Sequence, residues 1–140
     1  MSESNVNKIK KEYPNRVAET LFDKYLYFST QEQVEESDVY VISPDAIDQF
    51  KQNYTGKKRI KVIYVSVSEW MRKSRMQRRG DSEVDIAQRL AFDNMIFNNA
   101  EDLADFSIRN YVLSDTVDRI KKQLKLWEKE KVGRRCKKQK

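Results

Sequence analysis

One apolar segment, Ile60–Val67, constrains the fold more than any other part of the chain; it reads IKVIYVSV. Its hydrophobic residues fall on both faces of an extended chain, a pattern typical of a parallel strand that is covered on both sides. Such strands occur almost only in α/β proteins, where helices cross over between neighbouring strands. The segment therefore predicts a parallel sheet flanked by helices.

The segments on either side predict alternating helices and strands. After this strand we expect helices over 68–79 and 83–98, separated by Gly80, a strand over 106–112, and a last helix capped by Ser114 that frays near Gly133. Its buried face is expected to contain Val117, Ile120, Leu124 and Trp127. Before the strand we expect an antiparallel pair (17–22 and 25–28), a helix over 31–36 with a capping box, a strand over 38–42, and a helix from Pro44 to about Tyr54.

Length and charge divide the chain into three parts. At 140 residues it is long enough for one domain with a real core. We expect a polar N-terminal segment over 1–15, a domain over 16–130 and a basic disordered tail over 131–140. Removing the six basic residues of the tail from the total of 28 leaves 22, equal to the number of acidic residues, so the body is formally neutral. The predicted phosphate-contacting residues of this tail are Arg134, Arg135, Lys137, Lys138 and Lys140.

The composition excludes several kinds of site. The chain has no histidine and a single cysteine, Cys136, which excludes a histidine-based triad and an internal disulfide and argues against zinc. We expect no cofactor. No apolar run is long enough to cross a membrane and no signal pattern opens the chain, so we expect a soluble cytoplasmic protein that makes no membrane contact.

Four motifs in chain order resemble the guanylate kinase family of P-loop nucleoside-monophosphate kinases, including small phage-encoded members. They are DVYVISPDAI (Asp38–Ile47), RMQRRGDSE (Arg75–Glu83), RLAFD (Arg89–Asp93) and ADFSIRN (Ala104–Asn110). The resemblance covers roughly Val17 to Leu126. It implies a P-loop kinase-like sheet, and it identifies the second motif as the lid that closes over the phosphates.

The resemblance also implies candidate site residues. Lid arginines of the family neutralise charge on the transferred phosphoryl group, and Arg75, Arg79 and Arg89 match that role by position. An aromatic–threonine pair that contacts the monophosphate acceptor would correspond to Tyr27 and Thr30. The competing interpretation is a solvated helix face, in which Asp81 and Glu83 pair with the arginines.

The departure from the family is the phosphate-binding loop. No G-x-x-x-x-G-K-S/T motif occurs, and the chain has only three glycines, Gly56, Gly80 and Gly133. The first strand of the family's sheet, which lies between the equivalents of 38–42 and 60–67, is missing with it. The two flanking strands are then expected to pair directly or through self-association; a partner filling the gap and an unstable fragment are the alternatives.

These features favour a non-catalytic, kinase-like binding protein, a regulator or inhibitor of a host protein or nucleoprotein, encoded by a phage or mobile element. A macromolecular partner is therefore expected, and a homodimer is an alternative. One rival interpretation is part of a nucleoside-monophosphate kinase whose P-loop is supplied in trans. The other is nucleic-acid binding through the tail and the lid arginines. An exposed tryptophan, at Trp70 or Trp127, would indicate a protein interface, whereas helix packing is the expectation for both.

Overall fold

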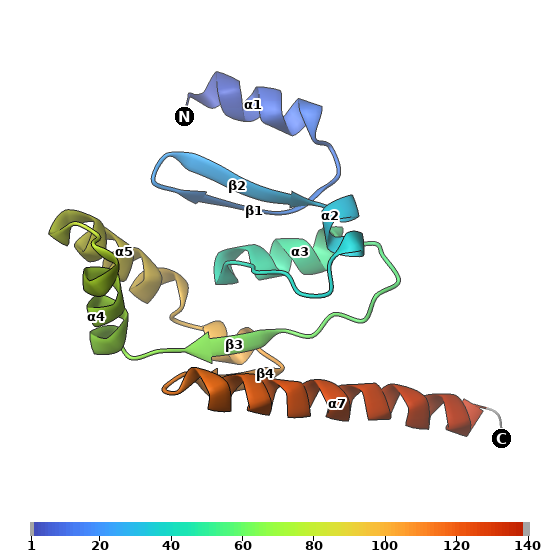
Figure 1. The fold of residues 1–140 in the computed structure, drawn as a ribbon. Coiled ribbons are helices and arrows are strands. Elements are labelled where there is room, and N and C mark those ends of the chain that lie inside the picture. The colour runs from blue at the N-terminus through green and yellow to red at the C-terminus, as the bar shows by residue number, and fades with distance from the viewer. Residues whose placement is uncertain (1, 139–140) are drawn as a thin grey trace.

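The structure is a computed structural model that describes the backbone of residues 2–138 and the side chains of residues 2–130. Over these residues the protein is mixed α/β, with seven α-helices, one short 3-10 helix (η1) and two sheets of two strands each (Figure 1). The elements are α1 (Glu3–Glu12), β1 (Arg16–Phe22), β2 (Tyr25–Thr30), α2 (Gln31–Glu36), η1 (Pro44–Ala46), α3 (Ile47–Asn53), β3 (Ile63–Ser66), α4 (Glu69–Arg79), α5 (Glu83–Ile96), α6 (Ala100–Leu103), β4 (Phe106–Arg109) and α7 (Leu113–Lys138).

The predicted antiparallel pair is confirmed as the hairpin β1–β2. Its register pairs Thr20 with Tyr27 and Phe22 with Tyr25. The turn residues Asp23 and Lys24 have φ values of 45° and 67°, as expected of a two-residue hairpin turn whose twist matches that of the strands. The hairpin leads directly into α2.

The capping box of α2 is also confirmed. The hydroxyl of Thr30 accepts a hydrogen bond from the backbone N–H of Gln33, and the Gln33 side chain accepts one from the Thr30 N–H. Both of these amides would otherwise lack a partner at the start of the helix. The Thr30 side chain is therefore committed to the helix end.

The first hydrophobic core lies between the hairpin and α3. Its buried residues are Val17, Ala18, Val34, Ala46 and Phe50, against which Tyr40, Ile42 and Tyr54 pack. The expected helix from Pro44 begins as the 3-10 turn η1 and continues as α3, and the predicted buried stripe of Ala46, Ile47 and Phe50 is confirmed. The α1 helix precedes this core and buries no residue of its own.

The strand predicted over Asp38–Ile42 is wrong. The side chains do alternate as in a strand, since Val39 and Val41 are 84% and 90% exposed whereas Tyr40 and Ile42 pack against the core. However, no neighbouring strand pairs with this segment, so it is an irregular connection between α2 and η1. The pattern correctly indicated two faces, but a strand also requires a ladder of hydrogen bonds to a neighbour.

The predicted parallel sheet is present but small. β3 pairs with β4 in parallel, with Ile63 opposite Phe106 and Ser66 opposite Arg109. Both strands are shorter than the predicted ranges 60–67 and 106–112, because pairing on one edge alone orders only four residues of each. The expected direct pairing between 38–42 and β3 does not form.

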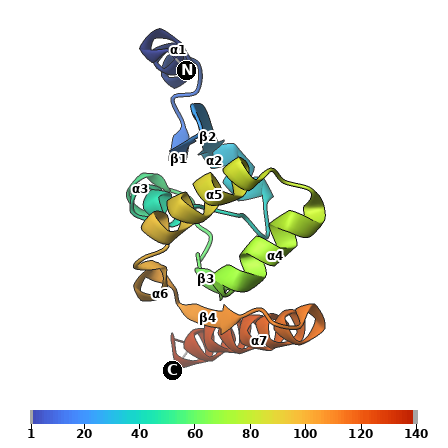
Figure 2. The same cartoon turned by 90° about the vertical axis from the view of Figure 1, so that its left-hand side faces the viewer.

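The helices predicted over 68–79 and 83–98 are confirmed as α4 and α5. α4 begins after its N-cap Ser68 and ends at Gly80, which has the left-handed φ of 91° typical of a glycine that ends a helix. α5 begins after its N-cap Ser82. The two helices lie next to one another (Figure 2), and Met76 of α4 packs with Ile86 and Leu90 of α5 in a second, separate core.

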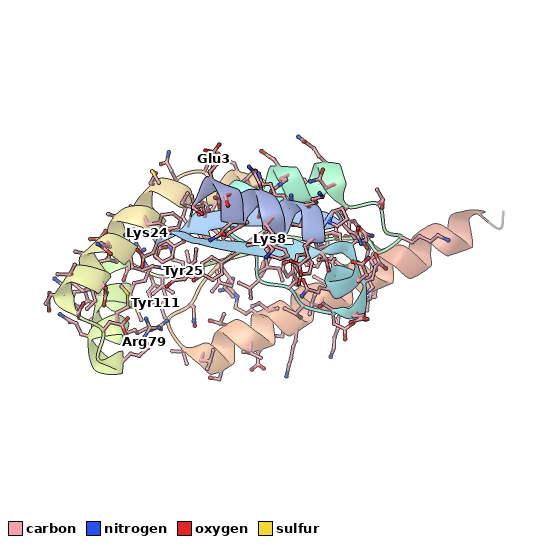
Figure 3. All side chains as sticks on the ribbon, turned by 90° about the horizontal axis from the view of Figure 1, so that it is seen from above. Glu3, Lys8, Lys24, Tyr25, Arg79 and Tyr111 are labelled. Carbon is pink, nitrogen blue, oxygen red and sulfur yellow. The ribbon has the colours of Figure 1, made fainter. Side chains whose placement is uncertain are left out.

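The long helix α7 lies along the small parallel sheet (Figures 1 and 2), and its C-terminal end projects beyond the other elements (Figure 3). It begins at Leu113, so Ser114 lies within its first turn and is not the expected cap. Of the predicted buried face, Trp127 is 7% exposed, whereas Val117 and Leu124 are 39% and 43% exposed, because two short strands cannot cover a helix of this length. Helix packing is therefore confirmed for Trp127.

The side chains of 131–140, and with them the predicted basic tail, lie outside what the structure describes, although the α7 backbone continues to Lys138. Between residues 2 and 138, none of the helices combines the length and the apolar character that crossing a membrane requires.

Candidate ligand pocket and lid arginines

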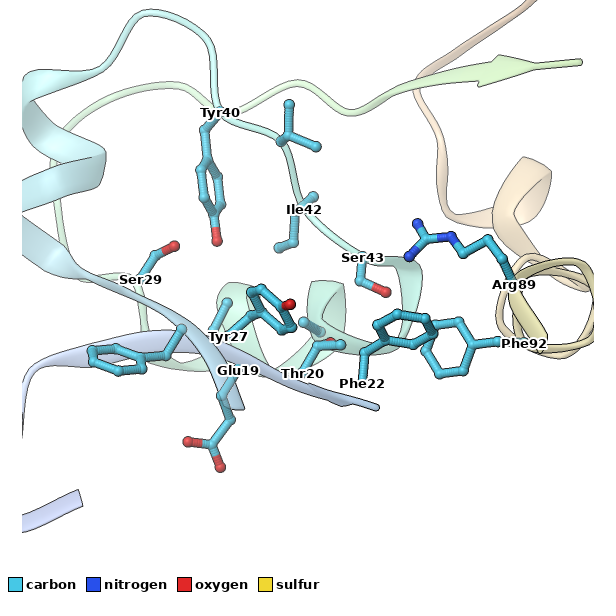
Figure 4. Close-up of a pocket in the computed structure, with 14 residues that line it drawn as sticks. Glu19, Thr20, Phe22, Tyr27, Ser29, Tyr40, Ile42, Ser43, Arg89 and Phe92 are labelled. Atoms are coloured by element: carbon cyan, nitrogen blue, oxygen red, sulfur yellow. The ribbon is translucent and has the colours of Figure 1, made fainter. Parts of the chain in front are cut away.

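A pocket of about 500 Å³ lies between the hairpin, the connection 40–43 and α5 (Figure 4). The apolar part of its lining comes mainly from the hairpin, which includes Phe22, from the connection 40–43, and from Phe92 of α5. Its polar lining contains five hydroxyls, from Thr20, Tyr27, Ser29, Tyr40 and Ser43, and one guanidinium, from Arg89. Glu19 also belongs to the lining, but its carboxylate points away in Figure 4 and pairs with Arg16 at 2.9 Å.

Asp45 fixes two of these hydroxyls. The Thr20 hydroxyl donates to Asp45 Oδ1 at 2.9 Å, and the Ser43 hydroxyl donates to the same oxygen. With their protons committed, both hydroxyl oxygens can only accept further hydrogen bonds. Thr20 is positioned by the hairpin, where it stands opposite Tyr27, and Ser43 by the start of η1.

Arg89 is held at one end of the pocket by the aromatic rings below it. Its guanidinium lies 4.8 Å from the Phe22 ring centroid, and Phe22 in turn meets Phe92 edge-to-face at 4.6 Å. Arg89 Nε also lies 3.2 Å from Asp93 Oδ1. Asp93 Oδ1 accepts no hydrogen bond of good geometry among the described residues, so this contact is a charge pair.

Asp93 is shared between two guanidiniums. Its second oxygen lies 3.6 Å from Arg72 Nη1, and Arg72 also donates to the Asn94 side chain at 3.1 Å. Asn94 in turn donates to the carboxylate of Glu69 at 2.9 Å, so two carboxylates and two guanidiniums lie together at this end of α5. The Arg89 side chain keeps 48% of its exposure, which leaves its outer N–H groups open to an anion.

The other two predicted lid arginines do not reach the pocket. Arg79 donates two hydrogen bonds to the carboxylate of Asp81, which raises the pKa of Arg79 and lowers the pKa of Asp81. Arg75 donates to the backbone carbonyl of Asn110 at 3.4 Å. For Arg79 the structure therefore agrees with the competing interpretation, in which Asp81 occupies the arginine.

The pocket thus brings together two of the five site residues that the resemblance implies, Tyr27 and Arg89. Thr30 does not line the pocket, because its side chain caps α2. Sequence reasoning missed Thr20, Ser43 and Phe22. Only the hairpin pattern could have indicated Thr20, since it stands opposite Tyr27 in the expected antiparallel pair.

No group of three or more histidine, cysteine, aspartate or glutamate side chains in the described part of the chain could hold a metal ion. No known protein family matches the sequence, and a comparison with curated proteins gave no significant match.

Proposed function

We propose that this chain is a non-catalytic binding protein on a scaffold resembling that of P-loop nucleoside-monophosphate kinases, and that its pocket takes a nucleoside monophosphate. The observation that carries the proposal is the convergence of Tyr27 and Arg89 on one pocket rich in hydroxyls. The rings of Tyr27 and Tyr40 offer surfaces for a base, and Arg89 offers charge for a phosphate. Thr20 and Ser43, held as acceptors by Asp45, suit the N–H groups of a base.

Two features favour binding without phosphoryl transfer: the absence of a phosphate-binding loop from the sequence, and the pairing of Arg79 with Asp81. Phosphoryl transfer needs a cradle for the donor phosphates and several cations around the transferred group. The sequence contains no phosphate-binding loop, and Arg79 is paired with Asp81. A monophosphate can therefore be held beside Arg89, whereas the machinery for a triphosphate donor is missing from this chain.

Isothermal titration calorimetry tests this proposal with a panel of nucleoside monophosphates, each paired with its nucleoside. At least one monophosphate should bind, and its nucleoside should bind more weakly. Arg89→Gln should weaken binding by roughly 1.5–3 kcal/mol, the value of a hydrogen bond to a charged group, or about tenfold to a hundredfold. Arg79→Gln and Arg119→Gln, an exposed position on α7, are matched controls that should change affinity less than about twofold.

Two results would contradict the proposal. The first is no heat of binding with any monophosphate while the protein is folded. The second is ADP release from ATP and Mg²⁺ in the presence of the bound monophosphate, which would favour the kinase interpretation.

A second role, regulation of another macromolecule, is favoured by the exposed apolar residues. Trp70 on α4 is 77% exposed, contrary to the expected helix packing, and Val39 and Val41 are more exposed still. Exposed tryptophan is typical of protein interface hot spots. We therefore propose that the protein acts by binding a macromolecular partner, with the pocket ligand as a second input. Nucleic-acid binding through 131–140 remains a prediction, to be tested by a steep fall of binding with salt.

A further inference from the structure

Asp45 fixes the direction of two hydrogen-bonding groups of the pocket without lining the pocket itself. Its Oδ1 accepts hydrogen bonds from the hydroxyls of Thr20, at 2.9 Å, and Ser43. An ionised carboxylate can only accept hydrogen bonds, so each hydroxyl must direct its single proton to Asp45. Thr20 and Ser43 both line the pocket, to which they therefore present hydrogen-bond acceptors only.

These two acceptors are close neighbours, although they come from different parts of the chain. Thr20 belongs to β1, and Ser43 is the residue before η1. Because both hydroxyls bond to the same oxygen atom of Asp45, their own oxygens must lie near one another. Figure 4 shows the two side chains next to each other in the pocket, with Tyr27 and Phe22 beside them. The pocket wall therefore contains a pair of adjacent acceptors.

The other three hydroxyls of the lining are adaptable. The hydroxyls of Tyr27, Ser29 and Tyr40 form no hydrogen bond with another residue in the part of the chain that the structure describes. Each can rotate its proton toward a ligand or away from it, and so can donate or accept as the ligand requires. Discrimination between ligand groups therefore depends on the pair that Asp45 holds.

The acceptor pair lies next to the charged end of the pocket. Thr20 and Phe22 are two residues apart on β1, so their side chains stand on the same face of the hairpin. The guanidinium of Arg89 lies over the Phe22 ring, 4.8 Å from its centroid. A nucleoside monophosphate whose phosphate contacts Arg89 can thus direct its base toward Thr20 and Ser43.

We propose that Asp45 is a positioning residue that makes the pocket select bases with an exocyclic amino group over bases with a carbonyl at the same place. This inference rests on the proposed binding of a nucleoside monophosphate. An amino group has two N–H donors, one for each acceptor. A carbonyl oxygen has none, and the single ring N–H beside it can satisfy one acceptor at most. The acceptor left without a partner then weakens binding of the carbonyl form.

The test measures affinity ratios by calorimetry on the full chain, with two ligand pairs that exchange an amino group for a carbonyl: CMP with UMP, and AMP with IMP. Asp45→Ala frees both hydroxyl protons, and Thr20→Val removes one acceptor at nearly constant shape. Asp48→Ala is the matched control, because Asp48 is an exposed acid in the first turn of α3 and does not line the pocket. A general loss of stability weakens both members of a pair and leaves their ratio unchanged.

In the wild type and in Asp48→Ala, the amino member of at least one pair should bind about tenfold tighter than its carbonyl partner. Asp45→Ala should reduce this ratio to about twofold or less, and Thr20→Val should also lower it. If Asp45→Ala does not fold, the ratio in Thr20→Val decides.

Equal affinity within both pairs, preference for the carbonyl members, or a ratio that the folded variants leave unchanged would overturn the inference. The proposed function would survive these results, because a monophosphate would still bind and its affinity would still depend on Arg89. Binding of none of the four ligands would overturn the inference as well. The proposed function would fail with it only if the remaining monophosphates also gave no heat of binding.

Discussion

The contact between Phe22 and Phe92 should affect the ligand affinity of the pocket, because the guanidinium of Arg89 lies over the Phe22 ring. Phe92 is half-buried on α5, and its ring meets Phe22 at 4.6 Å with an interplanar angle of 62°. Phe92→Ala removes this aromatic pair, worth about 0.5–1.5 kcal/mol, together with part of the burial of the ring. Since a fully buried phenylalanine costs about 3–5 kcal/mol on truncation, a half-buried one should cost about 2 kcal/mol.

Phe97→Ala is the matched control for this substitution. Phe97 follows the same helix, is also half-buried, and stacks on Tyr64 at a centroid distance of 5.9 Å, away from the pocket lining. Urea unfolding should show a similar loss of stability in both variants. Only Phe92→Ala should weaken monophosphate binding, by about fivefold, because Phe22 and Arg89 lose their support from α5.

Comparing the two variants separates support of Arg89 from a general loss of stability. If Phe92→Ala loses stability and still binds the monophosphate like the wild type, Arg89 does not depend on the aromatic support. If both variants lose the same binding affinity, the effect is a general loss of stability and says nothing about the pocket.

Three further predictions follow from local contacts. Thr30→Ala removes the hydroxyl that accepts a hydrogen bond from the Gln33 N–H and should lower the free energy of unfolding by about 1 kcal/mol, measured by urea titration; an unchanged midpoint would contradict the cap. In single-tryptophan variants, iodide should quench Trp70 strongly and Trp127 weakly, because they are 77% and 7% exposed; equal quenching would contradict the arrangement of α4 and α7. Hydrogen bonding to Arg79 lowers the pKa of Asp81 from its ordinary value of 3.8. The pair therefore stabilises the folded state fully above pH 3.8, and this contribution is lost as the pH falls through the lowered pKa. Acid titration of Asp81→Asn should lack this component, and an identical acid profile for the two proteins would contradict the pair.

Local signals in the sequence predicted most of the elements correctly. The capping box at Thr30 and Gly80 between α4 and α5 each act within a few residues, and the structure confirms them. The hairpin was predictable for the same reason, because its two strands are separated by two residues.

Non-local pairing was predicted less well. The apolar alternation of 38–42 is real, but whether it becomes a strand depends on a neighbour that the sequence of this segment does not specify. The predicted lengths of β3 and β4 were too long for the same reason. The burial predicted for Val117 and Leu124 was wrong as a consequence, because α7 was expected to pack on a larger sheet.

The site was partly predictable. The resemblance brought Arg89 and Tyr27 to attention, and the structure places both at one pocket. It could not show that Thr30 caps a helix, or that Asp45 orients Thr20 and Ser43, because these bonds depend on the packing of η1 against the hairpin.

We propose that a nucleoside monophosphate occupies the pocket beside Arg89. The most direct measurement is a two-dimensional amide and arginine side-chain NMR titration of the isotope-labelled chain with the best-binding monophosphate. Occupancy of the pocket should give saturable shifts at Thr20, Tyr27, Ser43 and the Arg89 side chain, with the Arg79 side chain unmoved. Shifts confined to the turn between α4 and α5, or no saturable shift in this pocket, would contradict it.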